Sequence, residues 1–155
     1  MIRALVLGLG TVVAACLLAA CGGSSEVSTE DYTEAVVSTR DRVDFALAQI
    51  TVGQGTIEDL VKRMEDAADL IDEAADDFDN AGAAQDFEDE TTTLVAAYHQ
   101  LAAALAGTAN DASQPGMEGL LTGSKALQFP GWTKANRVLA SLDEQGISVE
   151  PIGSH

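Results

Sequence analysis

The sequence has few of the side chains from which active sites and metal centres are most often built. Its 155 residues include two cysteines, two histidines and one tryptophan. Zinc sites made of cysteine and histidine need several such residues at set spacings, and this chain does not offer them. Both cysteines, Cys16 and Cys21, lie near the start of the chain. The rest of the chain therefore carries no disulfide and must fold by packing alone.

Basic residues are also scarce. The chain has 8 Lys and Arg residues against 25 Asp and Glu residues, which gives a formal net charge of −17. A surface of this charge repels nucleic acid and anionic lipid headgroups. No basic run with interleaved aromatic residues is present, so the sequence argues against nucleic-acid binding.

No recognisable catalytic set is present. His99 falls just beside the apolar stripe of its helix, so we interpret it as a partly exposed helical histidine rather than a general base. A di-iron site in a helical bundle needs Glu-x-x-His pairs, and position 96 is alanine. The Gly-Gln-Gly-Thr sequence at 53–56 lacks the lysine of a phosphate-binding loop. We therefore expect a protein that is not an enzyme and has no catalytic residues, although scattered carboxylates leave a hydrolase or transferase open.

What the sequence does have is an apolar segment at its start. Arg3 precedes an apolar run over 4–18 that is interrupted only by Gly8, Gly10 and Thr11, and small residues follow before Cys21. This order is typical of a secretory signal peptide. The alternative is a transmembrane helix, but the run is at the short edge of the roughly 20 apolar residues that span a bilayer.

The four residues Leu18-Ala19-Ala20-Cys21 resemble the lipobox of bacterial lipoproteins. The resemblance covers the start of the chain only and implies that 1–20 is a cleaved signal peptide and that Cys21 carries a diacylglycerol. Removing Arg3 with this peptide leaves 7 basic residues against 25 acidic ones, a formal charge of −18. Two acyl chains anchor a protein stably, whereas one chain is marginal. The resemblance therefore implies a cell-membrane lipoprotein on the extracytoplasmic face.

The remainder predicts a tether followed by one helical domain. Residues 21–27 contain the lipidated Cys21 and a flexible Gly-Gly-Ser-Ser stretch. Ser28 to Asp31 has the pattern of a capping box and predicts a helix start, and Thr56 with Asp59 predicts a second one. We expect an acidic helical bundle over 28–146 and an extended C-terminal tail over 147–155, with Ile147 and Val149 docked against the bundle.

Apolar residues at helical spacing predict three long helices, over about 29–52, 56–80 and 83–106, the last ending at Gly107. Two shorter pieces over 117–128 and 133–145 flank Phe129-Pro130-Gly131. Proline disfavours helical backbone at the residue before it, so a break is expected there. Matched helix lengths with short connections favour antiparallel neighbours. The predicted fold is all-α: an antiparallel four-helix bundle whose fourth helix is broken near Pro130.

The sharpest candidate for a ligand site is the acidic segment over 77–88. Asp77, Asp79, Gly82 and Glu88 fall at positions 1, 3, 6 and 12 of the pattern that resembles the calcium loop of EF-hand proteins. Ala81 departs from the pattern because it offers no side-chain oxygen. The simpler interpretation is that Asp77 and Asp79 cover a solvated face while Gly82 turns the chain. We expect no cofactor other than weakly bound calcium.

Trp132, Lys134 and Arg137 form the one place where aromatic and basic residues gather. Tryptophan and arginine are enriched at interface hot spots, so the three residues are a candidate partner-binding edge. The alternative is that Trp132 plugs the end of the bundle, and its exposure discriminates between the two.

The leading hypothesis is therefore a non-enzymatic lipoprotein, held to the membrane through lipid on Cys21, that binds or scaffolds another envelope protein. One alternative is a divalent-cation (calcium) binding or sensing domain centred on Asp77 to Glu88. A second alternative is a small-ligand carrier, which needs a pocket.

Overall fold

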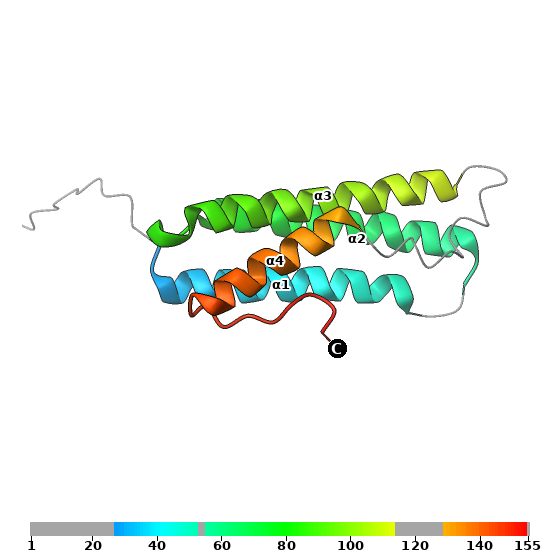
Figure 1. Cartoon of the computed structure of the whole chain (residues 1–155). Helices are drawn as coiled ribbons and strands as arrows, with labels where there is room; N and C mark the ends of the chain where they lie inside the picture. Colours follow the sequence, from blue (N-terminus) through cyan, green and yellow to red (C-terminus); the bar gives the residue numbers. More distant parts are fainter. Residues whose placement is uncertain (1–26, 53–54, 114–128, 155) are drawn as a thin grey trace, which may run out of the picture.

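The computed structural model describes residues 27–52, 55–113 and 129–154. Its elements are α1 (Thr29–Thr51), α2 (Ile57–Ala81), the short 3-10 helix η1 (Gln85–Phe87), α3 (Glu88–Ala112) and α4 (Pro130–Glu144), as Figure 1 shows. Within the described ranges the regular structure is helical throughout, with no strand. The predicted all-α helical bundle is confirmed.

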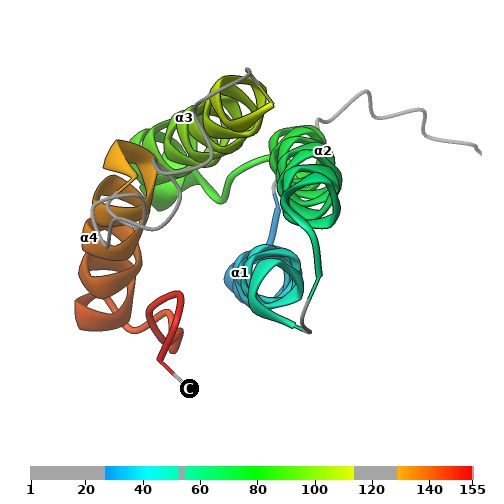
Figure 2. The ribbon, with the colours of Figure 1, turned by 90° about the vertical axis from the view of Figure 1, so that its right-hand side faces the viewer.

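Helices that follow one another in the chain pack against one another: α1 on α2, α2 on α3, and α3 on α4. Figure 1 shows the chain running along α1, back along α2 and forward again along α3. Figure 2 looks along the bundle and shows the helices in an open arc, with the C-terminal segment in the gap between α4 and α1. The bundle is thus completed by a tail rather than by direct packing of α4 on α1.

Side-chain caps determine where the first two helices begin. The backbone N–H of Asp31 donates to the hydroxyl of Ser28 over 3.1 Å. At α2 the box is reciprocal: the Asp59 N–H donates to the Thr56 hydroxyl over 3.2 Å, and the Thr56 N–H donates to the Asp59 carboxylate over 2.9 Å. These bonds satisfy backbone donors that have no partner inside the helix. Both predicted helix starts are confirmed.

The core consists of the apolar stripes that helical periodicity predicts. Tyr32 is central to it, because its ring stacks on Phe87 with centroids 5.1 Å apart and meets Phe78 at 6.1 Å. Its hydroxyl lies 2.9 Å from that of Thr91, which in turn donates to the Phe87 carbonyl. The largest fully buried side chains are Tyr32, Val36, Val43, Ile71, Phe78, Leu94, Tyr98, Leu101, Leu105, Leu139, Leu142 and Ile147.

The predicted end of the third helix at Gly107 is wrong. Helix α3 continues through Gly107 to Ala112 and buries Ala109 and Ala112 beyond it. A glycine inside a helix disfavours it by only about 1 kcal/mol relative to alanine, so burial of the next turns outweighs it.

Pro130 begins a helix. It occupies the first helical position of α4, where its missing N–H has no intrahelical partner to lose, and Phe129 precedes it in extended conformation. The predicted piece over 117–128 lies outside the described residues, so the break of the fourth helix near Pro130 stays a prediction.

The segment after α4 lies against the bundle as expected. Ile147, Val149 and Ile152 are buried among the core residues. The Ile147 N–H donates to the Leu142 carbonyl and closes the end of α4. This tail passes from α4 toward α1 and is held there by the polar network described below.

Candidate functional site

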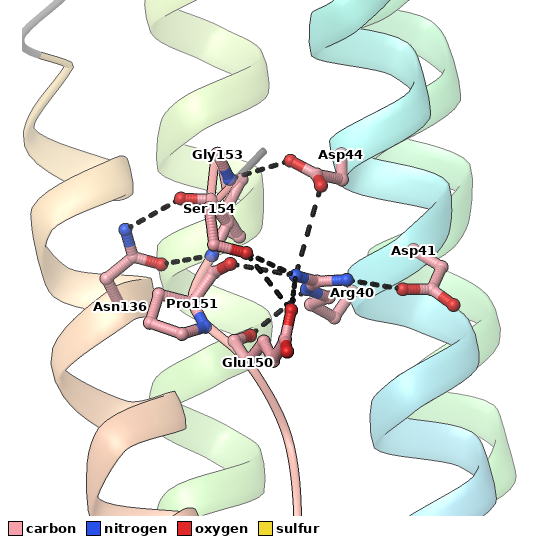
Figure 3. Close-up of polar contacts among 9 residues, drawn as sticks. Arg40, Asp41, Asp44, Asn136, Glu150, Pro151, Gly153 and Ser154 are labelled. Atoms are coloured by element: carbon pink, nitrogen blue, oxygen red, sulfur yellow. Dashed lines mark hydrogen bonds and ion pairs between the residues drawn. The ribbon is translucent and has the colours of Figure 1, made fainter.

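A buried arginine joins α1 to the tail. Arg40 is only 7% exposed. Its Nε donates to the Glu150 carbonyl over 3.0 Å, and its Nη2 donates to the Pro151 carbonyl over 2.9 Å and to the Ser154 hydroxyl over 3.0 Å, as Figure 3 shows. Its Nη1 lies 2.7 Å from a carboxylate oxygen of Asp41. The planar guanidinium thus uses its fixed fork of donors to hold the tail backbone.

Two further side chains bind the same tail. The Gly153 N–H donates to the buried carboxylate of Asp44 over 2.7 Å. On the other side, Asn136 of α4 accepts from the Ile152 N–H over 2.7 Å and donates to the Ile152 carbonyl over 3.2 Å. The tail is therefore bonded to α1 on one side and to α4 on the other (Figure 3). This network is structural, because it satisfies partly buried backbone groups of the tail.

The buried hydroxyl of Tyr98 has no hydrogen-bond partner among the described residues. Burial raises the pKa of Tyr98 far above its usual range, and the nearby Arg40 cation opposes this shift while Asp44 adds to it. The phenol is therefore neutral at physiological pH and fills space in the core. It offers neither a proton acceptor nor a nucleophile.

The tail network was not predicted, although a signal for it is present. Arg40 and Asp44 lie four residues apart on the stripe that contains Val36, Val43 and Leu47. A charged pair on a buried face predicts a polar partner from elsewhere in the chain, because an unpaired buried charge is strongly unfavourable. Here the partner is mainly the backbone of the tail, and because every residue has a backbone, the sequence does not show where that partner lies.

His99 bridges two helices as part of the surface. Its Nδ1 lies 2.6 Å from a carboxylate oxygen of Asp72 on α2, and its Nε2 lies 3.6 Å from Asp76. The ring is partly exposed, as predicted for a helical histidine. Within the described ranges no group of three or more His, Cys, Asp or Glu side chains is arranged to hold a metal ion.

The residues of the predicted calcium loop lie on helices. Asp77 and Asp79 belong to the last turns of α2, which ends at Ala81, and Glu88 is the first residue of α3. Asp77 is paired with Arg42 of α1 over 2.6 Å. Only 82–84 separate α2 from η1, so the geometry lends the loop no support. Calcium binding stays a prediction. It is tested by measuring the melting temperature at millimolar calcium: a melting temperature above that of a NaCl control of the same ionic strength would support it.

Trp132 is half-buried and packs against the core, Lys134 is half-buried, and Arg137 is exposed. A Cβ placed on Gly153 would lie 2.6 Å from the Trp132 ring, so the indole covers the tail backbone at this glycine. Trp132 thus supports the tail. A partner-binding role for these three residues stays a prediction.

A surface depression of about 540 Å³ lies between α1 and α2. It is lined by Glu34, Val37, Ser38, Asp41, Arg42 and Phe45 of α1 and by Leu70 of α2. Sequence reasoning missed this groove. Phe45 lies off the buried stripe of α1, and an aromatic residue in that place is the signal that could have found it.

No protein-family model, curated protein or solved structure matches this chain. In the described part of the chain, no helix combines the length and the apolar character that crossing a bilayer requires. Cys21, the predicted lipidation site, lies outside the described residues.

Proposed function

We propose that this protein is a lipid-anchored lipoprotein of the bacterial envelope. Its acidic helical bundle is a non-enzymatic binding or scaffolding module for another envelope protein. The observation that carries the proposal is Leu18-Ala19-Ala20-Cys21 at the end of an apolar segment. Dual acylation of Cys21 supplies the anchor, and the short segment before Ser28 tethers the bundle to it.

The character of the bundle supports this role. Its buried polar groups serve structure: Arg40 and Asp44 hold the tail, and Thr91 bonds Tyr32. Most acidic side chains in the described ranges are exposed, and a net charge of −17 keeps such a body from adhering to anionic lipid. A lipid on Cys21 is then the means by which the protein stays at a membrane.

The experiment compares the native protein with a Cys21→Ser variant in cells given labelled palmitate. We expect label on the native chain, a shift to the mature size, and membrane fractionation. The variant is expected to lose the label and the cleavage. A Cys16→Ser variant is the matched control, because it changes the other cysteine and leaves the lipobox intact. Labelling of Cys21→Ser equal to that of the native chain would overturn the proposal.

A further inference from the structure

Three large apolar side chains are exposed on the described surface: Phe45, Val52 and Leu70, which are 61%, 59% and 39% exposed. Two of the three, Phe45 and Leu70, lie at the same place. Single exposed apolar residues are normal on soluble domains and need no explanation. Phe45 and Leu70, however, come from different helices and line the same groove between α1 and α2.

The groove follows one face of α1. Glu34, Ser38, Asp41 and Phe45 recur at spacings of three and four residues, which places them in a line along the helix. Val37 lies in the groove beside this line of residues and is partly buried against the core. Leu70 lines the groove from α2. The result is an apolar strip that runs along the helix direction rather than an enclosed cavity.

Carboxylates dominate the rim of this strip. Glu34 and Asp41 lie on its α1 side. Arg42 is the cation among the lining residues, and it is already engaged by Asp77 at 2.6 Å and by Glu73 at 3.9 Å on α2. Around the groove, Glu34, Asp41, Glu73 and Asp77 face two guanidinium groups, Arg42 and, at Asp41, Arg40, which leaves a net negative charge around the apolar floor.

The apolar floor and the acidic rim together indicate which kind of partner binds in the groove. A second copy of the chain would bring the same acidic rim and a net charge of −17, so self-association through this face is opposed by repulsion. An elongated apolar floor suits a helix that presents side chains at intervals of three or four residues. The negative rim suits lysine or arginine beside those side chains.

We propose that the groove lined by Phe45 and Leu70 binds a basic amphipathic helix of a partner protein. The proposal rests on the binding role proposed above and names the partner chemistry for it. The apolar face of the partner helix lies on Phe45, Val37 and Leu70. Its basic flanks face Glu34 and Asp41, which set the orientation and speed the encounter.

The test measures peptide binding to the full chain in two forms: held in nanodiscs of neutral phosphatidylcholine, and as the unacylated Cys21→Ser variant in solution. The probe is a fluorescent synthetic helix with leucine on one face and lysine on the other, and fluorescence anisotropy gives its Kd. A matched peptide with glutamate in place of lysine and empty nanodiscs are the controls. We expect measurable binding of the lysine peptide alone.

Variants locate the site. Phe45→Ser is expected to weaken binding of the lysine peptide about tenfold, because a central aromatic contact is lost. Val52→Ser is the matched control, since Val52 is equally exposed and lies outside the groove lining, and its Kd should equal that of the native chain. Glu34→Gln should weaken binding and flatten its dependence on salt.

Equal affinities for the lysine and glutamate peptides, or equal losses in Phe45→Ser and Val52→Ser, would overturn the proposal. Concentration-dependent self-association that Phe45→Ser abolishes would overturn it in favour of a second copy. Peptide binding is read independently of acylation. Loss of palmitate label with intact peptide binding therefore rejects the anchor alone, and loss of binding by an acylated protein rejects the groove alone.

Discussion

Gly131 and Gly107 both lie inside helices, yet their surroundings are opposite. A Cβ on Gly131 would lie 2.4 Å from the Ala97 carbonyl oxygen and 2.5 Å from the Leu101 nitrogen, both of them backbone atoms of α3. A Cβ on Gly107 meets nothing within 4 Å. Gly131 therefore permits α4 to approach α3 closely, whereas Gly107 only weakens the helix that contains it.

These surroundings predict opposite effects of the same substitution. Gly131→Ala should destabilise the fold by about 1–3 kcal/mol, because backbone cannot move aside as a flexible side chain can. Gly107→Ala should stabilise it by up to about 1 kcal/mol, the helix-propensity difference. Urea unfolding followed by circular dichroism measures both. Equal changes of the same sign would contradict the close packing of α4 on α3.

The cap of α2 makes stability depend on pH. The Thr56 backbone N–H lowers the pKa of Asp59, and the Thr56 hydroxyl adds to this shift. A carboxylate with a lowered folded-state pKa contributes stability that is present above its unfolded value and is lost as the pH falls through the folded value. The loss is thus expected below about pH 4.

Asp59→Ala should therefore be less stable than the native chain near neutral pH, and the difference should shrink as the pH is lowered. Asp59→Asn is the matched control, because its amide oxygen keeps an acceptor for the Thr56 N–H but does not titrate. Unfolding free energies measured by urea from neutral to acid pH test this. A difference between native and Asp59→Ala that is constant across pH would be inconsistent with the charged cap.

At the scale of whole elements, the tail takes the place of a helix-to-helix contact. It lies between α4 and α1, where Arg40 holds its carbonyls and Asn136 holds Ile152 (Figures 2 and 3). The strength of this closure depends on one guanidinium that is almost completely buried. Such groups matter most when a partner is removed, because the rest of the network is left buried and unsatisfied.

Arg40→Ala should cost about 3–5 kcal/mol of unfolding free energy, as expected when one member of a buried charged network is removed. Arg42→Ala is the control: its pairs with Glu73 and Asp77 are largely exposed, so a change of about 0–1 kcal/mol is expected. Hydrogen exchange should also show faster exchange of the Ile152 and Gly153 amides in Arg40→Ala alone. Similar losses in both variants would argue against a closing role for the tail.

The helices could be predicted because apolar residues recur at helical spacing: Tyr32, Val36, Val43 and Leu47 mark one face of α1 unambiguously. The residues at which helices end were harder to predict. Gly107 has the residue type of a stop, but burial of Ala109 and Ala112 overrides it.

The candidate groove depends on which exposed faces come together across α1 and α2. The position of Phe45 off the buried stripe signals an exposed aromatic residue, but it does not say that Leu70 of α2 lies beside it. The tail contacts were hidden for a related reason, since Arg40 binds backbone carbonyls that every residue has.

The whole molecule is a strongly negative rod of helices. In the described part of the chain, Lys and Arg pair with a minority of the carboxylates, as Lys62 does with Asp66 over 2.8 Å and Arg42 with Asp77. The remaining acidic side chains repel one another across the surfaces of α2 and α3. Self-repulsion of this kind keeps a protein soluble but opposes the compact state.

Stability should therefore rise with ionic strength. Adding NaCl from low concentration to about 0.15 M shortens the Debye length to about 8 Å and screens repulsion between exposed carboxylates. We expect a higher melting temperature by calorimetry, with most of the gain below physiological salt. A melting temperature that falls over the same range would show that the surface ion pairs outweigh the repulsion.

The bond between Arg40 and the carbonyl of Glu150 spans 110 residues of sequence. During biosynthesis, α1 leaves the ribosome long before the residues that will receive its guanidinium. The first helix must wait, hydrated and only partly covered, until residues 150–154 have been made. Chaperones consequently have a long interval in which to meet the open form.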